Sequence, residues 1–222
     1  MIITWYGHSC FKIQTRNSGK DVVIYIDPFD KSIGLRPPSG QGQIVLSTHG
    51  HPDHNNIKTI KGKPFVIEGP GEYEIKGIRI LGISAFHDSK EGGERGLTTI
   101  YVIESEEMRI CHLGDLGQKE LTEEQLEGLD GVDVLMVPVG GNFTISGEQA
   151  SKIINQIEPK IAIPMHYKIP KLAIKLDGVE KFLKVMGEGK IAPEDKLVLR
   201  KKELPQEEET KIVILKLAGY SE

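Results

Sequence analysis

The ten-residue run STHGHPDHNN, residues 47–56, places three of the chain's seven histidines beside an aspartate. The run follows a short apolar segment that we expect to be a strand, so its polar side chains project from a rigid strand end. In an extended chain, residues i and i+2 point to the same side, and His49 and His51 can therefore share one metal ion. Asp53 and His54 come after a turn that can direct them to a second ion. A hydrogen-bonded polar turn is the alternative interpretation.

Three further candidates lie far from this cluster in the sequence. His87 follows the apolar run RILGISAF, Asp115 follows RICHL, and His166 follows KIAIP. Each comes just after a separate predicted strand, so all three can converge on one edge of a β framework. Any one of them alone would more often be structural than a ligand. Together with the cluster they indicate a site for one or two metal ions, because zinc accepts imidazole nitrogen and carboxylate oxygen.

The rest of the chain is a series of strands followed by strand–helix alternation. Predicted strands are Ile2–Trp5, Cys10–Gln14, Val22–Ile26, Ile44–Ser47, Phe65–Glu68, Glu72–Ile75, Ile78–Ser84, Thr98–Glu104, Arg109–Leu113, Val132–Pro138, Ile161–Pro164, Lys196–Leu199 and Lys211–Leu217. Predicted helices are 122–129, 146–157 and Gly178–Met186, and predicted loops are 34–43 and the charged segment 201–210. This order indicates sheets with helices on their outer faces. The pattern alone does not choose among several α/β and α+β folds.

Composition narrows the class of protein. A chain of 222 residues forms one domain, at most two. The net charge of −4 argues against an extended nucleic-acid-binding surface, although it leaves room for a local basic patch. Cys10 and Cys111 lie in apolar stretches and are expected to be buried free thiols. No signal peptide and no run of about 18 apolar residues is visible, so we expect a cytoplasmic protein without a membrane segment.

The ligand pattern resembles the five-motif signature of the metallo-β-lactamase superfamily. GHSCF (7–11), IDPF (26–29), FHD (86–88), ERG (94–96) and HLGDLG (112–117) further resemble the ascorbate-6-phosphate lactonase-like branch of small metal-dependent hydrolases. The resemblance implies an α+β fold, an αββα sandwich of four layers, as a single domain over residues 1–222. It also implies two divalent metal ions, with zinc favoured and manganese or iron as alternatives.

The same resemblance assigns roles to individual residues. His49, His51 and His87 would hold the first ion, Asp53, His54 and His166 the second, and Asp115 would bridge the two. The ions would share a hydroxide that attacks the substrate, with Asp53 as the catalytic residue that accepts a proton or steers the hydroxide. Asp27 resembles the family's carboxylate that orients a ligand histidine without touching metal.

Four other residues are weighed between a structural and a functional role. For His8 and His112 we favour a hydrogen-bonded structural histidine, or one that supports a ligand, over a direct catalytic role. Arg95 either binds an anionic substrate or anchors its glycine-rich loop. Lys168, with Lys171 and Lys175 nearby, belongs either to a substrate-binding surface or to an ordinary solvated face.

These expectations favour a metal-dependent hydrolase that cleaves an ester-like bond. A phosphodiester and a lactone or phosphorylated small molecule are both compatible, because both develop oxyanion charge that two cations stabilise. A β-lactam is disfavoured by the bridging Asp115. The alternatives are a non-catalytic binding or sensor module that retains metal, and a structural protein with an empty site. Beyond a small-molecule or phosphodiester substrate, no partner is indicated, and a homo-oligomer is left open.

Overall fold

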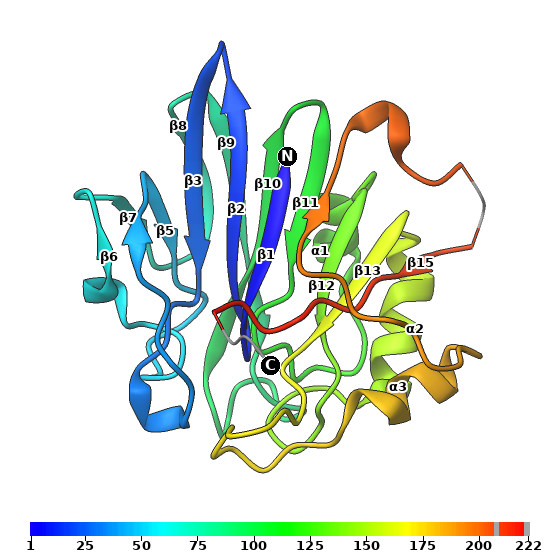
Figure 1. The fold of residues 1–222 in the computed structure, drawn as a ribbon. Helices are drawn as coiled ribbons and strands as arrows, with labels where there is room; N and C mark the ends of the chain where they lie inside the picture. The colour runs from blue at the N-terminus through cyan, green and yellow to red at the C-terminus, as the bar shows by residue number, and fades with distance from the viewer. Residues whose placement is uncertain (207–208, 220–222) are drawn as a thin grey trace.

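Two β-sheets lie face to face in the computed structural model, which describes residues 1–206 and 209–219 (Figure 1). The first sheet has six strands in the order β14-β1-β2-β3-β5-β7. These are β1 (Ile2–Gly7), β2 (Cys10–Asn17), β3 (Lys20–Ile26), β5 (Ile44–Leu46), β7 (Phe65–Ile67) and β14 (Leu197–Val198). The hairpins β1–β2 and β2–β3 are antiparallel, whereas β3, β5 and β7 run parallel.

The second sheet has seven strands in the order β15-β13-β12-β11-β10-β9-β8. These are β8 (Gly71–Ile75), β9 (Ile78–Phe86), β10 (Leu97–Ser105), β11 (Met108–His112), β12 (Val134–Pro138), β13 (Ile161–Met165) and β15 (Lys211–Ile212). Strands β8 to β11 form an antiparallel meander, and β11, β12, β13 and β15 are parallel.

The main hydrophobic core fills the space between the sheets. In β1 the residues alternate, so that Ile3 and Trp5 are buried in the core while Thr4 is half-buried on the other face. Strands β12 and β13 are instead buried along their whole length, because the other sheet covers one face and helices cover the opposite one.

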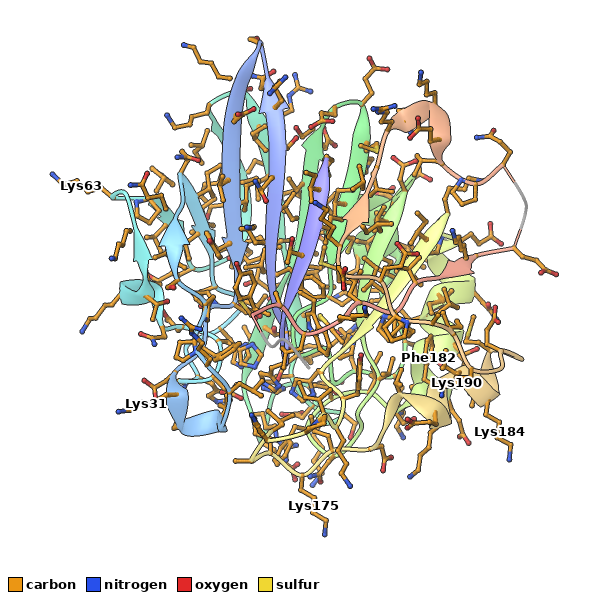
Figure 2. The ribbon with its side chains drawn as sticks, in the orientation of Figure 1. Lys31, Lys63, Lys175, Phe182, Lys184 and Lys190 are labelled. Atoms are coloured by element: carbon orange, nitrogen blue, oxygen red, sulfur yellow. The ribbon has the colours of Figure 1, made fainter. Side chains whose placement is uncertain are left out.

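Three α-helices gather over the seven-stranded sheet: α1 (Glu123–Leu129), α2 (Gly147–Ile157) and α3 (Val179–Val185) (Figure 1). Helix α2 begins with a capping box in which the Ser146 hydroxyl accepts from the Gln149 N–H and the Gln149 side chain accepts from the Ser146 N–H. Its apolar stripe of Ala150, Ile153 and Ile154 is buried, as the spacing predicts. Lysines such as Lys184 project away from the sandwich (Figure 2).

Every predicted strand and helix has a counterpart, but three segments differ from the prediction. The charged segment 201–210, predicted as a loop, begins with a short 3-10 helix at Lys201–Glu203, and its residues 207–208 lie outside the described residues. The proline-rich segment 34–43, predicted as a loop, contains β4 (Gly40–Gln41), which pairs with β6 (Ile60–Lys61). The predicted strand Lys211–Leu217 is ordered as β15 only to Ile212. Beyond Val213 the backbone bonds to Glu194 instead of continuing along β13. The Glu194 N–H donates to the Ile214 carbonyl, and the Glu194 carbonyl accepts from the Lys216 N–H.

Six strands, three from each sheet, end near the metal-binding residues: β1, β3, β5, β9, β11 and β13. This edge of the sandwich is at the bottom of Figure 1. The residues that follow these strand ends are the ones with metal-binding chemistry, namely His8, Asp27, the loop 47–56, His87, Asp115 and His166. In residues 1–206 and 209–219, no helix is long and apolar enough to cross a membrane.

Candidate metal centre

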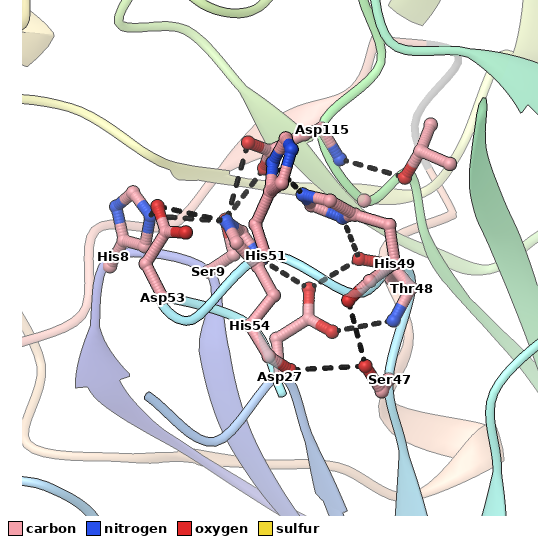
Figure 3. Close-up of polar contacts among 12 residues, drawn as sticks. His8, Ser9, Asp27, Ser47, Thr48, His49, His51, Asp53, His54 and Asp115 are labelled. Carbon is pink, nitrogen blue, oxygen red and sulfur yellow. Dashed lines mark hydrogen bonds and ion pairs between the residues drawn. The ribbon is translucent and has the colours of Figure 1, made fainter. Parts of the chain in front are cut away.

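The loop that follows β5 is folded back on itself by hydrogen bonds among its own residues. The Ser47 hydroxyl donates to the carbonyls of His49 and His54, at 3.0 and 3.2 Å. The His54 N–H donates to the carbonyl of His51 at 2.9 Å. This closed turn gathers His49, His51, Asp53 and His54 on one side of the strand end (Figure 3).

One group of histidines matches the set predicted for the first ion. His49, His51 and His87 each offer a ring nitrogen, and the three nitrogens lie within 4.8 Å of one another. His49 Nε2 and His51 Nδ1 are 2.9 Å apart. Gly117 packs against the His87 backbone, where a Cβ atom would lie only 2.4 to 2.5 Å from main-chain atoms. A glycine is therefore required for this loop to approach His87.

A second group differs from the set predicted for the second ion, because it contains His8 where the prediction has Asp53. His54 and His166 are joined by His8, with ring nitrogens again within 4.8 Å. His8 Nε2 lies 3.2 Å from His54 Nε2 and 3.1 Å from Asp53 Oδ2. Asp53 Oδ2 is itself 3.5 Å from His54 Nε2. The structure thus places the His8 ring beside the predicted ligands, where the sequence favoured a supporting position.

The Asp115 carboxylate lies between the two groups. Its Oδ2 atom is 3.2 Å from His166 Nε2, 3.3 Å from His54 Nε2 and 3.6 Å from His87 Nε2. Its Oδ1 atom accepts a hydrogen bond from the Ser9 hydroxyl at 3.3 Å. This is the geometry expected of a carboxylate that bridges two ions.

Asp27 supports the centre from behind, as the resemblance implies. One oxygen accepts from the Thr48 N–H and the other from the Thr48 hydroxyl, both at 2.8 Å. The second oxygen also lies 2.9 Å from His54 Nδ1, so the His54 Nε2 atom is turned towards the centre (Figure 3). A carboxylate behind a ligand histidine fixes the ring orientation and raises its basicity.

His112 has a different role from the other histidines. Its Nε2 donates to the Ser9 carbonyl at 2.9 Å, and its Nδ1 accepts from the Gly114 N–H at 3.1 Å. Both ring nitrogens are occupied within the protein and the side chain is fully buried. His112 is therefore a satisfied structural histidine, one of the two roles favoured from sequence.

The electrostatics of His8, His49 and Asp115 favour the forms that bind metal at neutral pH. Burial, together with the His166 imidazole, lowers the pKa of His8 to about 4, and burial beside His54 lowers the pKa of His49 to about 3. Burial alone would raise the pKa of Asp115, but His166 and His54 hold it well below its usual range. Neutral imidazoles and ionised carboxylates are the states that bind divalent cations.

His54 marks where positive charge is most favourable. Burial lowers the pKa of His54, but the carboxylates of Asp115 and Asp27 outweigh this effect and raise the pKa well above its usual value. Two buried carboxylates on either side of one ring require compensating positive charge. A divalent cation at the His54 Nε2 atom would supply it.

Facing ring nitrogens provide a test of whether a cation fits. His49 Nε2 lies 2.9 Å from His51 Nδ1, and His8 Nε2 lies 3.2 Å from His54 Nε2. The Nε2 atoms of His87 and His166 face the Asp115 carboxylate at 3.6 and 3.2 Å. These inward nitrogens fit a group of imidazoles arranged around bound ions. The Nδ1 atoms on the far side of the His8, His87 and His166 rings are, among the described residues, buried without a hydrogen-bond partner.

Three residues of the centre have a left-handed backbone: His8, Asp27 and His166, with φ of 53°, 48° and 52°. Such a conformation costs a non-glycine residue about 1–3 kcal/mol and clusters at functional sites. The His8 carbonyl is fixed by hydrogen bonds from the Trp5 indole at 3.0 Å and from the His166 N–H at 3.1 Å. The surrounding structure therefore holds these side chains in place against local strain.

A cleft of about 420 Å³ opens beside the centre. It is lined by His51, Pro52, Asp53, His87, Glu94, Arg95, Asp115, Phe143, His166 and Ile174. The Arg95 guanidinium lies over the Phe143 ring, 5.1 Å from its centroid, at the rim of this cleft. Lys168 is exposed and does not line the cleft, so its substrate-binding role stays a prediction.

Some contributors were not singled out from the sequence. Thr48 belongs to the run 47–56, but nothing in a sequence shows that its hydroxyl points back to Asp27. Phe143 and Ile174 lie on separate loops and carry no motif, so only the fold brings them to the cleft. For His8, the position shortly after the predicted strand Ile2–Trp5 is the available signal.

Comparisons with known proteins agree with this geometry. The family model of the β-lactamase superfamily domain matches residues 2–166. A UPF0173 metal-dependent hydrolase of Methanopyrus kandleri is 30% identical over 198 residues, which cover 75% of this chain and 84% of that protein. A UPF0173 metal-dependent hydrolase of Lysinibacillus sphaericus is also 30% identical, with 75% and 85% covered.

A solved structure from Thermotoga maritima shows the same fold over nearly the whole length. This protein, a proposed Zn-dependent hydrolase of the metallo-β-lactamase superfamily, is 36% identical, with a TM-score of 0.74. The match covers 96% of this chain and 97% of that one. The predicted sandwich of the metallo-β-lactamase fold is thereby confirmed, and the chain belongs to the UPF0173 family of metal-dependent hydrolases within the metallo-β-lactamase superfamily.

Proposed function

We propose that this enzyme cleaves an ester-like bond in a small molecule with the help of two divalent cations. The observation that carries the proposal is the position of Asp115 Oδ2, which lies 3.2 to 3.6 Å from the Nε2 atoms of His54, His87 and His166. One carboxylate oxygen between two groups of histidines suits a pair of ions better than a single one.

Each cation would be held by residues from separate strand ends. His49, His51 and His87 would hold the first, and His54, His166 and Asp53 the second, with His8 beside them and Asp115 between the two. We favour zinc because imidazole nitrogens dominate the donor set, and manganese or iron would accept the same ligands. Bound cations supply a water of lowered pKa and stabilise developing oxyanion charge.

The side chain of Asp53 reaches the cleft as an ionised carboxylate. It lines the cleft and is 26% exposed, whereas the side chain of Asp115 is 3% exposed. Burial would raise its pKa, but hydrogen bonds with His54 and His8 lower it well below the usual range, so that the carboxylate stays ionised. We assign Asp53 the role of orienting the attacking water or accepting its proton.

The substrate class is narrowed by the cleft. A volume of about 420 Å³ fits a small molecule or the end of a longer one. Phosphodiesters and lactones are both compatible with the donor set, and the second class corresponds to the ascorbate-6-phosphate lactonase-like branch whose motifs the sequence resembles.

Hydrolysis of bis-p-nitrophenyl phosphate tests the proposal. The protein is reconstituted separately with zinc and with manganese, and is compared with a double variant, His51→Ala with Asp53→Ala. We expect metal-dependent release of p-nitrophenolate that falls by at least a hundredfold in the double variant. Lys184→Gln, on the outer surface of α3, serves as a matched control for handling and folding.

Two results would redirect or overturn the proposal. Turnover of a γ-lactone but not of the phosphodiester, by protein with metal bound, would assign the lactone class. If neither compound is hydrolysed by metal-loaded protein, or if the double variant is as active as the wild type, the proposed reaction is wrong.

A further inference from the structure

A second, smaller cavity adjoins the cleft beside the metal centre. It measures about 140 Å³ and shares Glu94, Arg95 and Phe143 with the larger cleft. The Arg95–Phe143 pair therefore separates the two spaces. The far side of the small cavity is formed by Lys119 and by polar side chains near the start of α2, including Gln149.

Two cationic side chains line this cavity without an acidic partner. In the part of the chain that the structure describes, the side chains of Arg95 and Lys119 take part in no ion pair, and the Arg95 guanidinium stacks over the Phe143 ring. When a guanidinium stacks on an aromatic ring, its N–H groups point outward in the guanidinium plane. They can therefore bind carboxylate or phosphate oxygens.

The acidic residues around the cavity are already engaged elsewhere. The buried Asp88 carboxylate accepts backbone N–H groups from Lys90, Gly92, Glu94 and Arg95, at 2.7 to 3.0 Å. Glu94 is paired with Lys90 across one turn. Asp88 thereby fixes the loop that carries Arg95. Because the carboxylates of Asp88 and Glu94 are satisfied within this loop, Arg95 and Lys119 can attract an external anion.

Gln149 adds a donor of the right kind. Its Oε1 atom accepts the Ser146 N–H at 2.9 Å in the capping box of α2. This contact leaves the amide nitrogen, which is a donor, as the atom for a ligand in the cavity. The cavity thus combines two cationic side chains with a neutral donor, a set suited to anionic oxygens.

We propose that the small cavity is an anion subsite, so that the substrate carries a carboxylate or phosphate group besides the bond that is cleaved at the metal centre. A volume of about 140 Å³ equals that of roughly five water molecules, which fits such a group but not a second ring. This inference rests on the proposed hydrolase function, because it assigns the substrate's second contact in the same site.

The test compares two esters that differ only in the terminal group. In mono-p-nitrophenyl adipate a carboxylate replaces the terminal methyl of p-nitrophenyl hexanoate. We expect the wild type to prefer the adipate in kcat/KM, and the preference to fall by about tenfold or more in Arg95→Gln with Lys119→Gln, since charge-assisted hydrogen bonds are lost. Lys184→Gln with Lys190→Gln, which removes two exposed positive charges elsewhere, is the matched charge control and should keep the preference.

Calorimetric titration of the same metal-loaded proteins with adipate and with inorganic phosphate gives a second measurement that does not depend on turnover. Weaker binding of adipate alone in the double variant indicates a carboxylate ligand, and weaker binding of phosphate alone indicates a phosphate ligand. Unchanged ester preference and unchanged binding in the double variant would overturn the subsite. If the metal-loaded wild type hydrolyses neither ester, nor a γ-lactone, nor bis-p-nitrophenyl phosphate, the proposed function fails, while the titrations still decide the subsite.

Discussion

Asp27 lies behind the metal centre, where its carboxylate binds both Thr48 and His54. We expect Asp27→Asn to weaken zinc binding by about 10- to 100-fold, because an amide orients the His54 ring less firmly and lowers its basicity. Competition with a chromogenic chelator measures this affinity. Zinc affinity equal to that of the wild type would show that the contact of Asp27 with His54 does not support the centre.

His8 offers a second test at the scale of single residues. Its Nε2 atom lies 3.1 Å from Asp53 and 3.2 Å from His54, so we expect His8→Ala to weaken the second of two zinc-binding steps by at least tenfold and to leave the first unchanged. The matched comparison is His112→Gln, in which the removed ring faces Ser9 and Gly114 and not the ions. Equal stepwise affinities in His8→Ala and the wild type would return His8 to a purely structural role.

At this scale, the sequence predicted which residues meet but not how each is used. His49, His51, Asp53, His54 and the three later candidates were recognised because each follows an apolar segment, and a strand end fixes where its successor lies. Whether His8 lies among the ligands or only supports them depends on the direction of its ring. That direction is set by a left-handed backbone and by hydrogen bonds from Trp5 and His166, which are tertiary contacts that no local pattern encodes.

Among the elements, the hairpin between β10 and β11 has a two-residue turn that is strained. Glu106 and Glu107 both have a left-handed backbone, with φ of 52° and 62°, where glycine or asparagine is usual. We expect Glu107→Gly to raise stability by about 0.5–1 kcal/mol and the Tm by roughly 1–4 °C. Thermal unfolding followed by circular dichroism measures the change.

The neighbouring position supplies the control for this turn. Glu106→Gly relieves similar strain but loses the hydrogen bonds that Glu106 accepts from the Thr15 hydroxyl at 2.7 Å and from the Arg16 N–H at 3.0 Å. It should therefore be less stable than Glu107→Gly. A lower Tm for Glu107→Gly than for the wild type would contradict the interpretation of strain.

Strands and helices with a strong local pattern were predicted well, and those held by distant contacts were not. The capping box at Ser146 and the apolar spacing of α2 are local, so the helix could be located from sequence. Strand β4 exists only because β6 lies beside it, and β15 stops where the backbone turns to Glu194. Neither partner is visible in a window of neighbouring residues.

At the scale of the whole molecule, metal binding and folding should be linked. The centre joins six strand ends from both sheets, so a ligand there stabilises the folded sandwich against the unfolded chain. An ion at about 100 times its Kd contributes about 2.7 kcal/mol. We expect removal of metal with a chelator to lower the Tm by roughly 5–10 °C, as measured by calorimetry.

The double variant His51→Ala with Asp53→Ala provides the control for this linkage. Its Tm should change by less than half as much when metal is removed. A wild-type Tm that is the same with and without metal would mean that the strand ends are held by the protein alone. The fold class itself could be predicted from sequence because the ligand order resembles a known family, whereas the cleft depends on side chains from loops far apart in the chain.

The number of zinc ions per chain in reconstituted, gel-filtered protein, measured by inductively coupled plasma mass spectrometry, tests the dinuclear centre most directly. We expect about two ions in the wild type and fewer than one in Asp115→Ala, because Asp115 lies between both groups of histidines. Lys184→Gln should retain about two. A wild type that binds no zinc, manganese or iron, or an Asp115→Ala variant that binds as many ions as the wild type, would contradict the proposed dinuclear centre.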